Sequence, residues 1–373
     1  MKYITDLAKI PGISDEDRAR LTAVATKYAF RVSSYYLSLI DWSDPADPLR
    51  RIVIPDIGEL DDWGVLDASA EADNTPIRGV QHKYPHTVLL LCNEVCGAYC
   101  RYCFRKRLFM NDNDEASIDV TEGLAYIAAH PAVTNVLLTG GDPLLMSTPR
   151  LTRIIEGLRA IDHVKIIRIG SKMPAFEPGR LGDDEALLAL FRKHSTPERR
   201  IYLMAHFDHP RELTPRALEA LEKGREAGLA IVNQCPIVRG VNDDPTVLAE
   251  LFRALSFAGI APYYLFQGRP TAGNRPFETT IVESFFLFEE AKRRVSGLAK
   301  RARLVMSHAS GKVEIVGVDQ EHIYLRYHRA KDPADEGRFL VCRRDNEAQW
   351  LDDLVEVDGL GGRMGWEEEC AAS

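Results

Sequence analysis

The sequence predicts an α/β fold in which repeated strand–helix units build an open, partial (β/α)6 barrel of the TIM-like type. From His86 onward, apolar strand-like runs alternate with helical stretches, as in βα units on a parallel sheet. Six such runs can be counted, fewer than the eight of a full barrel. Motifs rich in Gly, Cys and polar residues follow the ends of these runs, where barrels of this kind place their active sites.

Residues 1–80 predict an N-terminal layer of helices and loops. Ser14 is followed by acidic residues, so it can cap a helix that runs through the twenties and thirties. The stretch 28–40 is apolar enough to pack against the remainder of the chain. We expect this layer to be accessory to the barrel.

Residues 81–300 contain the predicted barrel. Helical stretches such as Leu151–Ile161 and Val247–Phe257 separate its strands. The strand candidates are Thr87–Cys92, Thr134–Thr139, Val164–Gly170, Arg200–His206, Ala230–Pro236 and Pro262–Gln267.

Residues 301–373 predict a small antiparallel cap. A long helix near Ile281–Gly297 precedes it, and three alternating segments follow. These segments are Lys312–Val316, His322–His328 and Arg338–Cys342, and the chain after 355 carries no clear pattern.

The composition indicates a cytoplasmic protein with a small-molecule partner. The net charge is -8, and no basic cluster or tail points to nucleic acid or to an anionic membrane. We see no secretory signal pattern and no apolar run of about 18 residues. Four of the seven cysteines lie between positions 92 and 103, which suits a reducing compartment and cofactor binding better than disulfides.

Three cysteines, Cys96, Cys100 and Cys103, are spaced CxxxCxxC directly after the first strand candidate. Three thiolates on one loop can hold three irons of a 4Fe-4S cluster and leave the fourth iron open, since such clusters normally take four cysteines. A zinc knuckle is the alternative, but it needs four ligands and no second pair is visible. Cys92 is a further candidate ligand, although its apolar run favours a buried, unligated thiol.

A second motif, Gly140-Gly141-Asp142, follows the next strand candidate. Two glycines allow a backbone to approach a ligand closely, and exposed amides beside a carboxylate can receive amino and carboxylate groups. Alone it would read as an ordinary glycine turn. One strand after the cysteine loop, it favours a ligand site.

The cysteine spacing, with Tyr102 before the last cysteine, resembles the signature of radical S-adenosylmethionine (SAM) enzymes. The resemblance implies that SAM chelates the open iron and is cleaved by one electron to a 5'-deoxyadenosyl radical, which abstracts a substrate hydrogen. It also implies an electron donor of the flavodoxin or ferredoxin kind. The Gly140–Asp142 turn would then receive the methionyl end of SAM.

Over roughly residues 46 to 330 the chain resembles the lysine 2,3-aminomutase family, a family of isomerases. The matching segments are His82–Pro85, Arg105–Arg107, Gly140–Leu144, Arg168–Ser171, His206–Pro210, Asn233–Gln234, Arg239–Asp244, Pro262–Tyr264 and Ser310–Lys312. The resemblance implies that SAM is bound by Tyr102, Gly140, Gly141, Asp142, Arg168, Ser171, His206 and Gln234.

The family also uses pyridoxal 5'-phosphate (PLP), and its PLP-anchoring lysine matches Lys312. The resemblance places Lys83 and Tyr84 at the PLP site as well. Two family arginines that bind the PLP phosphate are replaced here by Lys83 and Thr87, so an arginine fork is lost. The lysine also follows His308 and Ser310-Gly311 instead of a run of glycines; His308 is open to an acid–base role or a turn-capping one.

For the substrate, Arg105 matches the family arginine that binds the α-carboxylate. The two aspartates that hold the distal ammonium of lysine are replaced by Arg269 and, allowing a gap, Ser307. A guanidinium in place of those anions disfavours lysine, because an unpaired buried charge is costly. The sequence therefore predicts a 2,3-aminomutase of another amino acid, with an acidic substrate such as glutamate favoured.

Several alternatives remain open at this point. The same scaffold could have lost PLP and catalyse a different hydrogen abstraction, act as an iron–sulfur electron carrier, or modify a lysine of another protein. A homo-oligomer is also possible. The family's C-terminal zinc site has no counterpart, since only Cys342 and Cys370 stand in that region, and zinc is not predicted.

Overall fold

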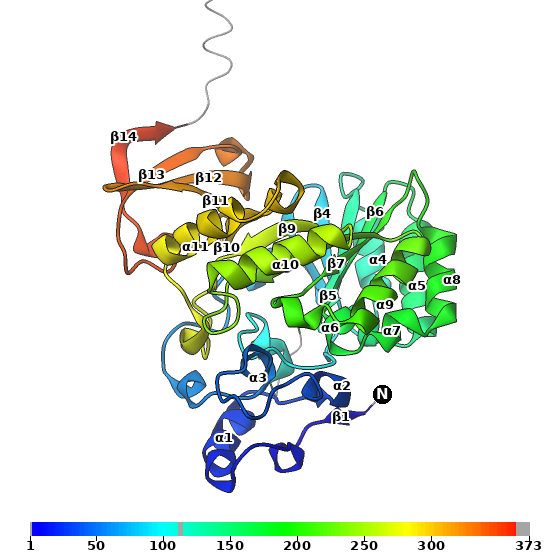
Figure 1. Ribbon diagram of the computed structural model, residues 1–373. Helices are drawn as coiled ribbons and strands as arrows, with labels where there is room; N and C mark the ends of the chain where they lie inside the picture. Colours follow the sequence, from blue (N-terminus) through cyan, green and yellow to red (C-terminus); the bar gives the residue numbers. More distant parts are fainter. Residues whose placement is uncertain (1, 111–114, 363–373) are drawn as a thin grey trace, which may run out of the picture.

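The computed structural model describes residues 2–110 and 115–362, and its main feature is one large curved sheet (Figure 1). Within these residues the sheet has 12 strands in the order β14-β13-β12-β11-β10-β9-β8-β7-β6-β5-β4-β3, so neighbours in the chain are neighbours in the sheet. Pairing is parallel from β4 to β10 and antiparallel at both ends. The predicted run of parallel βα units is confirmed.

The parallel strands agree with the six predicted runs, with boundaries that move by a few residues. They are β4 (Thr87–Asn93), β5 (Asn135–Gly140), β6 (Ile166–Ser171), β7 (Ile201–Ala205), β8 (Ala230–Pro236) and β9 (Ala261–Phe266). A seventh, β10 (Arg303–His308), was not predicted, because its short run Leu304–Met306 is flanked by polar residues. An antiparallel edge strand, β3 (Val80–Tyr84), was also missed.

The helices that connect these strands cover one face of the sheet (Figure 1). Proline in the first turn and side-chain caps such as Thr214 and Asp244 fix where several of them begin. They are α4 (Thr121–Ala128), α5 (Thr148–Arg159), α6 (Met173–Phe176), α7 (Gly179–Gly182), α8 (Glu185–His194), α9 (Pro215–Glu226), α10 (Pro245–Phe257) and α11 (Ile281–Arg293).

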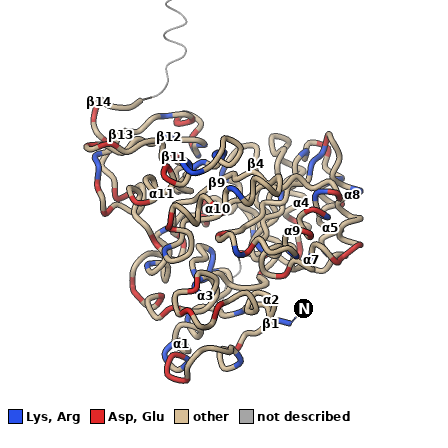
Figure 2. The backbone as a smooth tube through the Cα atoms, in the orientation of Figure 1, with Lys and Arg blue, Asp and Glu red and all other residues tan. Residues whose placement is uncertain are grey.

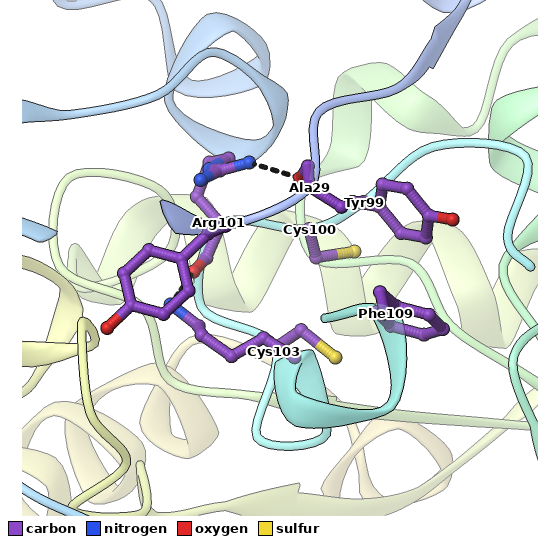
Figure 3. Close-up of a pocket in the computed structure, with 8 residues that line it drawn as sticks. Ala29, Tyr99, Cys100, Arg101, Cys103 and Phe109 are labelled. Atoms are coloured by element: carbon purple, nitrogen blue, oxygen red, sulfur yellow. Dashed lines mark hydrogen bonds between the residues drawn. The ribbon is translucent and has the colours of Figure 1, made fainter. Parts of the chain in front are cut away.

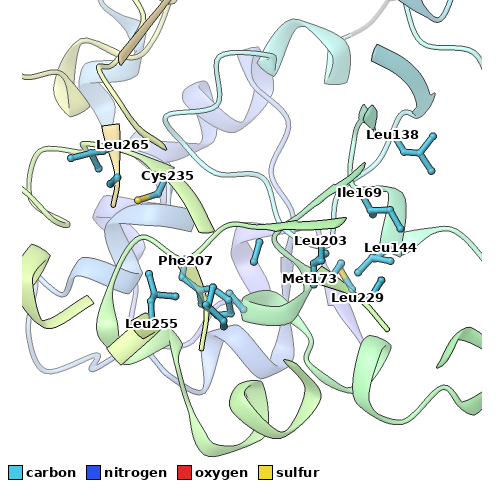
Figure 4. Packing of buried hydrophobic residues seen from close by; sticks show 14 of the residues in the cluster. Leu138, Leu144, Ile169, Met173, Leu203, Phe207, Leu229, Cys235, Leu255 and Leu265 are labelled. Carbon is cyan, nitrogen blue, oxygen red and sulfur yellow. The ribbon is translucent and has the colours of Figure 1, made fainter. Parts of the chain in front are cut away.

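The main core lies between the sheet and these helices. Leu138, Ile169 and Leu203 come from three adjacent strands and pack in it with side chains of the covering helices (Figure 4). Successive residues of a strand point to opposite faces. Residues such as Arg168, next to Ile169, therefore lie on the inner face of the sheet, away from the helices.

The N-terminal layer packs over the carboxyl ends of the barrel strands. Its hydrophobic cluster includes Tyr102, Phe176, Val238 and Phe277, all from segments that follow those ends. Ser14 caps the first helix as predicted, accepting from the amide of Asp17 at 3.1 Å. The elements of the layer are β1 (Tyr3–Ile4), α1 (Asp15–Lys27), β2 (Val32–Ser33), α2 (Ser34–Leu37) and α3 (Pro48–Val53).

One expectation for this layer was wrong. The helix that starts after Ser14 ends at Lys27 and does not continue through the thirties. The chain is extended at Val32–Ser33, where β2 pairs with β1, because tertiary pairing overrides the local apolar pattern.

The C-terminal region continues the same sheet with antiparallel strands. Three of them match the predicted segments, and β14 lies in the part of the chain for which no prediction was made. The strands are β11 (Gly311–Val318), β12 (His322–Ala330), β13 (Phe339–Arg343) and β14 (Glu356–Gly362). Cys370 lies outside the described residues, and the division of the chain at positions 80 and 300 stays a prediction.

The two ends of the parallel region are bridged by side chains. Lys83 on β3 donates to the carbonyl of His308 on β10, and Arg329 on β12 reaches Thr87 of β4 at 3.5 Å. The sheet is therefore curled, with β3 and β4 facing β10–β12 across its inner face. Acidic and basic residues are interspersed along the chain (Figure 2), and no helix in the described ranges is long and apolar enough to cross a membrane.

Candidate active site

The three cysteines of the CxxxCxxC motif lie on one loop directly after β4. Cys96, Cys100 and Cys103 are each only partly buried. The amide of Cys103 donates to the carbonyl of Cys100 at 3.0 Å, which makes a tight turn between these two residues. In Figure 3 the sulfur atoms of Cys100 and Cys103 both point to the side on which Phe109 lies. The loop lies at the edge of the hydrophobic cluster of the N-terminal layer, against which Cys100 packs.

The N-terminal layer holds this loop in place. The guanidinium of Arg101 pairs with Glu59 at 2.7 Å, and both side chains are at most 2% exposed. Arg101 also donates through Nη1 to the carbonyl of Ala29 at 2.9 Å (Figure 3), and its amide donates to Ile52. Loss of either partner of a buried ion pair leaves an uncompensated charge, so Glu59 of the N-terminal layer is needed to hold Arg101. The layer that we expected to be accessory therefore helps to position the cysteine loop.

Two opposing effects act on the thiols of the loop. Burial raises the pKa of all three thiols. Lysines act in the opposite direction, since Lys172 lowers the pKa of Cys100 and Lys106 lowers that of Cys103. Three thiolates match three irons of a 4Fe-4S cluster, and the two lysines would offset part of its negative charge. The residues present therefore fit such a cluster.

Cys92 does not join this group. Its side chain is 0% exposed and lies in the core between the sheet and the helices. Burial raises its pKa to about 12. The structure agrees with a buried, unligated thiol at this position.

The Gly140–Asp142 turn lies against the start of the cysteine loop, which corrects one expectation. The amides of Gly141 and Asp142 are not free for a ligand, because they donate to the carbonyls of Asn93 at 2.6 Å and Val95 at 3.0 Å. Gly140 has a φ of 104°, and a Cβ on Gly141 would lie 2.5 Å from the backbone of Val95. These glycines allow the ends of β4 and β5 to approach closely.

The carboxylate of Asp142 ties the end of β5 to the end of β6. It accepts from the Ser171 hydroxyl at 2.7 Å and from the amides of Leu144 and Lys172 at 2.9 and 2.8 Å. Burial raises the pKa of Asp142 to about 6, although these donors act to lower it. In this structure, Asp142 and Ser171 organise the turn beside Cys96, and their contact with SAM stays a prediction.

A buried charged network lies beside Cys100, and the sequence reasoning missed most of it. The ammonium of Lys172 lies 2.6 Å from Asp208 and 2.8 Å from Glu212. Tyr102 donates its hydroxyl to Asp208, and His206 Nε2 lies 2.9 Å from the same carboxylate. The structure thus brings together two predicted SAM residues, Tyr102 and His206. The pattern His206-Phe207-Asp208 was the one available signal, because alternate residues share a face.

Three arginines converge on Glu71, a residue the sequence reasoning did not identify. Arg105 forms a bidentate pair with it at 2.9 and 3.0 Å, Arg107 lies at 2.7 Å, and Arg269 lies at 3.7 Å. Burial acts to raise the pKa of Glu71, but the three guanidinium groups hold it well below its usual range. Arg105 also donates to Thr139 at 2.9 Å. Most of its donors are engaged, and its role toward a substrate carboxylate stays a prediction.

Arg269 is less completely paired than its neighbours. Its guanidinium stacks on the ring of Phe104, 3.6 Å from the ring centre, and the 3.7 Å contact with Glu71 is longer than a hydrogen bond. Burial, partly offset by Glu71, lowers the pKa of Arg269 to about 10. Ser307, the other predicted substrate residue, accepts at its carbonyl from Ser69 at 2.8 Å.

Lys312 lies on β11 within a group of cations and aromatic rings. Its ammonium is 5.0 Å from the centre of the Tyr264 ring and 4.8 Å from that of Phe266. Burial lowers the pKa of Lys312 well below its usual value, and the charges of Arg269 and Arg168 add to this effect. A lysine with a lowered pKa is a better nucleophile at neutral pH. The residues here fit a cofactor that reacts with an amine.

The other predicted residues divide between the two ends of the site. Arg168 donates to Asn135 at 2.8 Å and its charge acts on Lys312, while its predicted contact with SAM stays a prediction. Gln234 on β8 is in register with Tyr264 on β9, so it belongs to the inner face. His308 accepts at Nδ1 from the amide of Ser310, which is a turn-capping contact.

Comparison with known proteins agrees with this geometry. Residues 91–252 match the model of the radical SAM superfamily. A "Putative L-lysine 2,3-aminomutase" of Aquifex aeolicus (strain VF5) is 53% identical over 96% of this chain and 96% of its own length. An L-lysine 2,3-aminomutase of Fusobacterium nucleatum is 35% identical, over 80% of this chain and 70% of that protein. A glutamate 2,3-aminomutase of Clostridioides difficile (strain 630) is 30% identical, over 83% and 73%. The chain belongs to the lysine 2,3-aminomutase family of radical SAM enzymes.

Proposed function

We propose that this enzyme is a PLP-dependent 2,3-aminomutase of an acidic amino acid, with glutamate favoured over lysine. SAM would bind at the cluster held by Cys96, Cys100 and Cys103 and supply the radical. PLP would supply a conjugated system that spreads the unpaired electron of the substrate. The remaining roles belong to side chains of the chain itself.

The observation that carries the proposal is the setting of Lys312. Burial and four neighbouring cations favour its neutral amine, the form that reacts with an aldehyde. Tyr264 and Phe266 provide flat surfaces beside it. An ordinary surface lysine at the start of a strand would be solvated and charged, without buried cations and aromatic rings around it.

The charges around Lys312 favour an acidic substrate. Arg269 lies next to the predicted α-carboxylate residue Arg105 and is the less fully paired of the two. The one carboxylate between them, Glu71, is already shared by three arginines. A second ammonium group would meet like charge here, whereas a distal carboxylate would pair with Arg269.

The names of the relatives leave this choice open. The more similar proteins are named for lysine, and the relative named for glutamate is 30% identical. Replacement of the lysine-binding aspartates by Arg269 and Ser307 is the local reason to favour glutamate.

The test is covalent trapping on the complete chain. The protein is reconstituted anaerobically with iron, sulfide and PLP, reduced with borohydride and analysed by peptide mass spectrometry. We expect a phosphopyridoxyl group on Lys312, and loss of that adduct in Lys312→Ala. Lys331→Ala, which removes an exposed lysine nearby, is the matched control and should keep it.

Substrate choice is read from the same preparation. With SAM and a reductant, glutamate should give a β-amino acid product and lysine should give little. SAM cleavage without an adduct on Lys312 would instead favour a PLP-independent radical SAM enzyme on the same scaffold.

A further inference from the structure

Four cations face one another near β11 without a carboxylate partner. Among residues 2–110 and 115–362, none of the following has an ion pair: Lys83, Arg168, Lys312 and Arg329. By contrast, Arg101, Arg105 and Lys172 in the same barrel each have a close acidic partner. Like charges that gather without counter-charges repel one another, so this group is suited to a bound anion.

Arg329 is the member of this group best placed to grip such an anion. It is the register partner of Lys312 on the neighbouring strand. Its guanidinium stacks on the ring of Tyr84, 4.2 Å from the ring centre, and Nη1 reaches Thr87 at 3.5 Å. Stacking fixes the plane of the guanidinium and leaves its edges available. One long hydrogen bond uses little of the capacity of five N–H donors.

Lys83 is a second cation beside Arg329, and it lies on the same edge strand as Tyr84. Its ammonium donates to the carbonyl of His308, which directs it across the inner face toward β10. Burial, together with the charge of Arg269, lowers the pKa of Lys83 to about 8. A point charge and an arginine fork on facing sides are a common way to hold a phosphate.

We propose that Arg329 binds the phosphate group of PLP, with Lys83 as the second cation of that site. This inference rests on the function proposed above and names a binding residue for it. Arg329 reaches Thr87 from across the sheet, so its guanidinium lies beside β4 as well as beside Lys312. A phosphate monoester with an aldehyde satisfies both the unpaired cations and the reactive amine of Lys312.

The test compares PLP with pyridoxal, which has the aldehyde but no phosphate. Dissociation constants for both are measured on the reconstituted full-length chain by equilibrium dialysis. We expect Arg329→Gln to weaken PLP binding by about 10- to 100-fold and to change pyridoxal binding by less than about twofold. The PLP affinity of Arg329→Lys should lie between those of the unmodified protein and Arg329→Gln, since lysine keeps the charge without the guanidinium fork. This variant also provides the test if Arg329→Gln folds poorly.

Arg326→Gln is the matched control. Arg326 lies on the same strand but pairs with Glu314 at 2.7 Å near the surface, so PLP binding should not change. An adduct on Lys312 together with an unchanged preference for PLP over pyridoxal in both Arg329 variants would overturn the inference alone. Absence of any adduct in the unmodified protein would overturn the proposed function as well, so the two failures are distinguishable.

Discussion

The cysteine end and the Lys312 end of the site balance their charges in different ways. Around the cysteine loop, Arg101 pairs with Glu59 and Lys172 pairs with Asp208, and these side chains are almost fully buried. Around Lys312, the described residues offer several cations and no carboxylate dedicated to them. Both ends lie within one curved sheet.

Paired and unpaired buried charges have different consequences for a fold. Paired buried charges hold a loop in one geometry, because removal of either partner leaves an uncompensated charge. Unpaired cations hold nothing in place by themselves and become favourable once an anion arrives. Contacts within the protein therefore hold the cysteine end, whereas the cations at the Lys312 end would be stabilised by a bound anion.

The largest expected effect is at the cysteine loop. Changing Cys96, Cys100 or Cys103 to Ala should abolish SAM cleavage, because each change removes a ligand to one iron of the cluster. The measurement is 5'-deoxyadenosine formation by the anaerobically reconstituted enzyme, together with its iron content. Cys92→Ala is the control and should retain both, since its thiol lies in the core. SAM cleavage by a variant in which all three cysteines are changed to Ala would contradict the assignment of these cysteines as cluster ligands.

The next effect tests whether the framework depends on buried pairs. Glu59→Gln leaves Arg101 without its counter-charge at 0–2% exposure and should lower the free energy of unfolding by about 3–5 kcal/mol. Glu185→Gln breaks the exposed pair with Arg192 and should lower the free energy of unfolding far less, because solvent screens that pair. Urea denaturation of the two variants measures the difference. Equal losses would show that burial of the first pair does not matter.

The fold was largely predictable because its signals are local. Apolar runs of the right length identified the six strands from β4 to β9, and the alternating segments identified β11, β12 and β13. The missed strands β3 and β10 mix apolar with polar residues, and they are strands because they pair with β4 and β9. Their identity depends on neighbours distant in sequence, which local patterns do not contain.

The sequence pointed to candidate residues at both ends of the site but not to the residues that support them. The cysteine spacing and the Ser310–Lys312 match named these candidates, whose roles stay predictions. Glu59 and Glu71 were missed, because each is an ordinary acidic residue until the N-terminal layer packs on the barrel. The amides of the Gly140–Asp142 turn were misassigned for a related reason, since the sequence does not show that the cysteine loop already occupies them.

A smaller effect concerns substrate choice. Arg269→Gln should lower kcat/KM for glutamate by about 10- to 100-fold, because it removes the cation expected to pair with the distal carboxylate. The loss should appear mainly in KM, and SAM cleavage without substrate should be unchanged. Arg275→Gln, which alters a more exposed contact with Asp61, is the control. Full activity of Arg269→Gln on glutamate would show that Arg269 serves only to support Glu71 and Phe104.

The smallest expected effect tests the unpaired charge directly through pH. The pKa of Lys312 is lowered in the folded state, so the unfolded chain binds its proton more tightly. The lysine therefore destabilises the fold at neutral pH, and this penalty disappears as the pH rises toward the unfolded value of about 10.4. Without PLP or phosphate, Lys312→Met should be more stable than the unmodified protein at pH 7.

The gap between the two proteins should close by about pH 10.5, and denaturation at both pH values measures it. Lys331→Met, an exposed position, is the matched control. Added phosphate should stabilise the unmodified protein at pH 7, since a bound anion supplies the charge that the described residues around Lys312 do not. A gap that is the same at both pH values would mean that Lys312 is not held in its neutral form. The contrast between the two ends of the site would then rest on Arg329 and Lys83 alone.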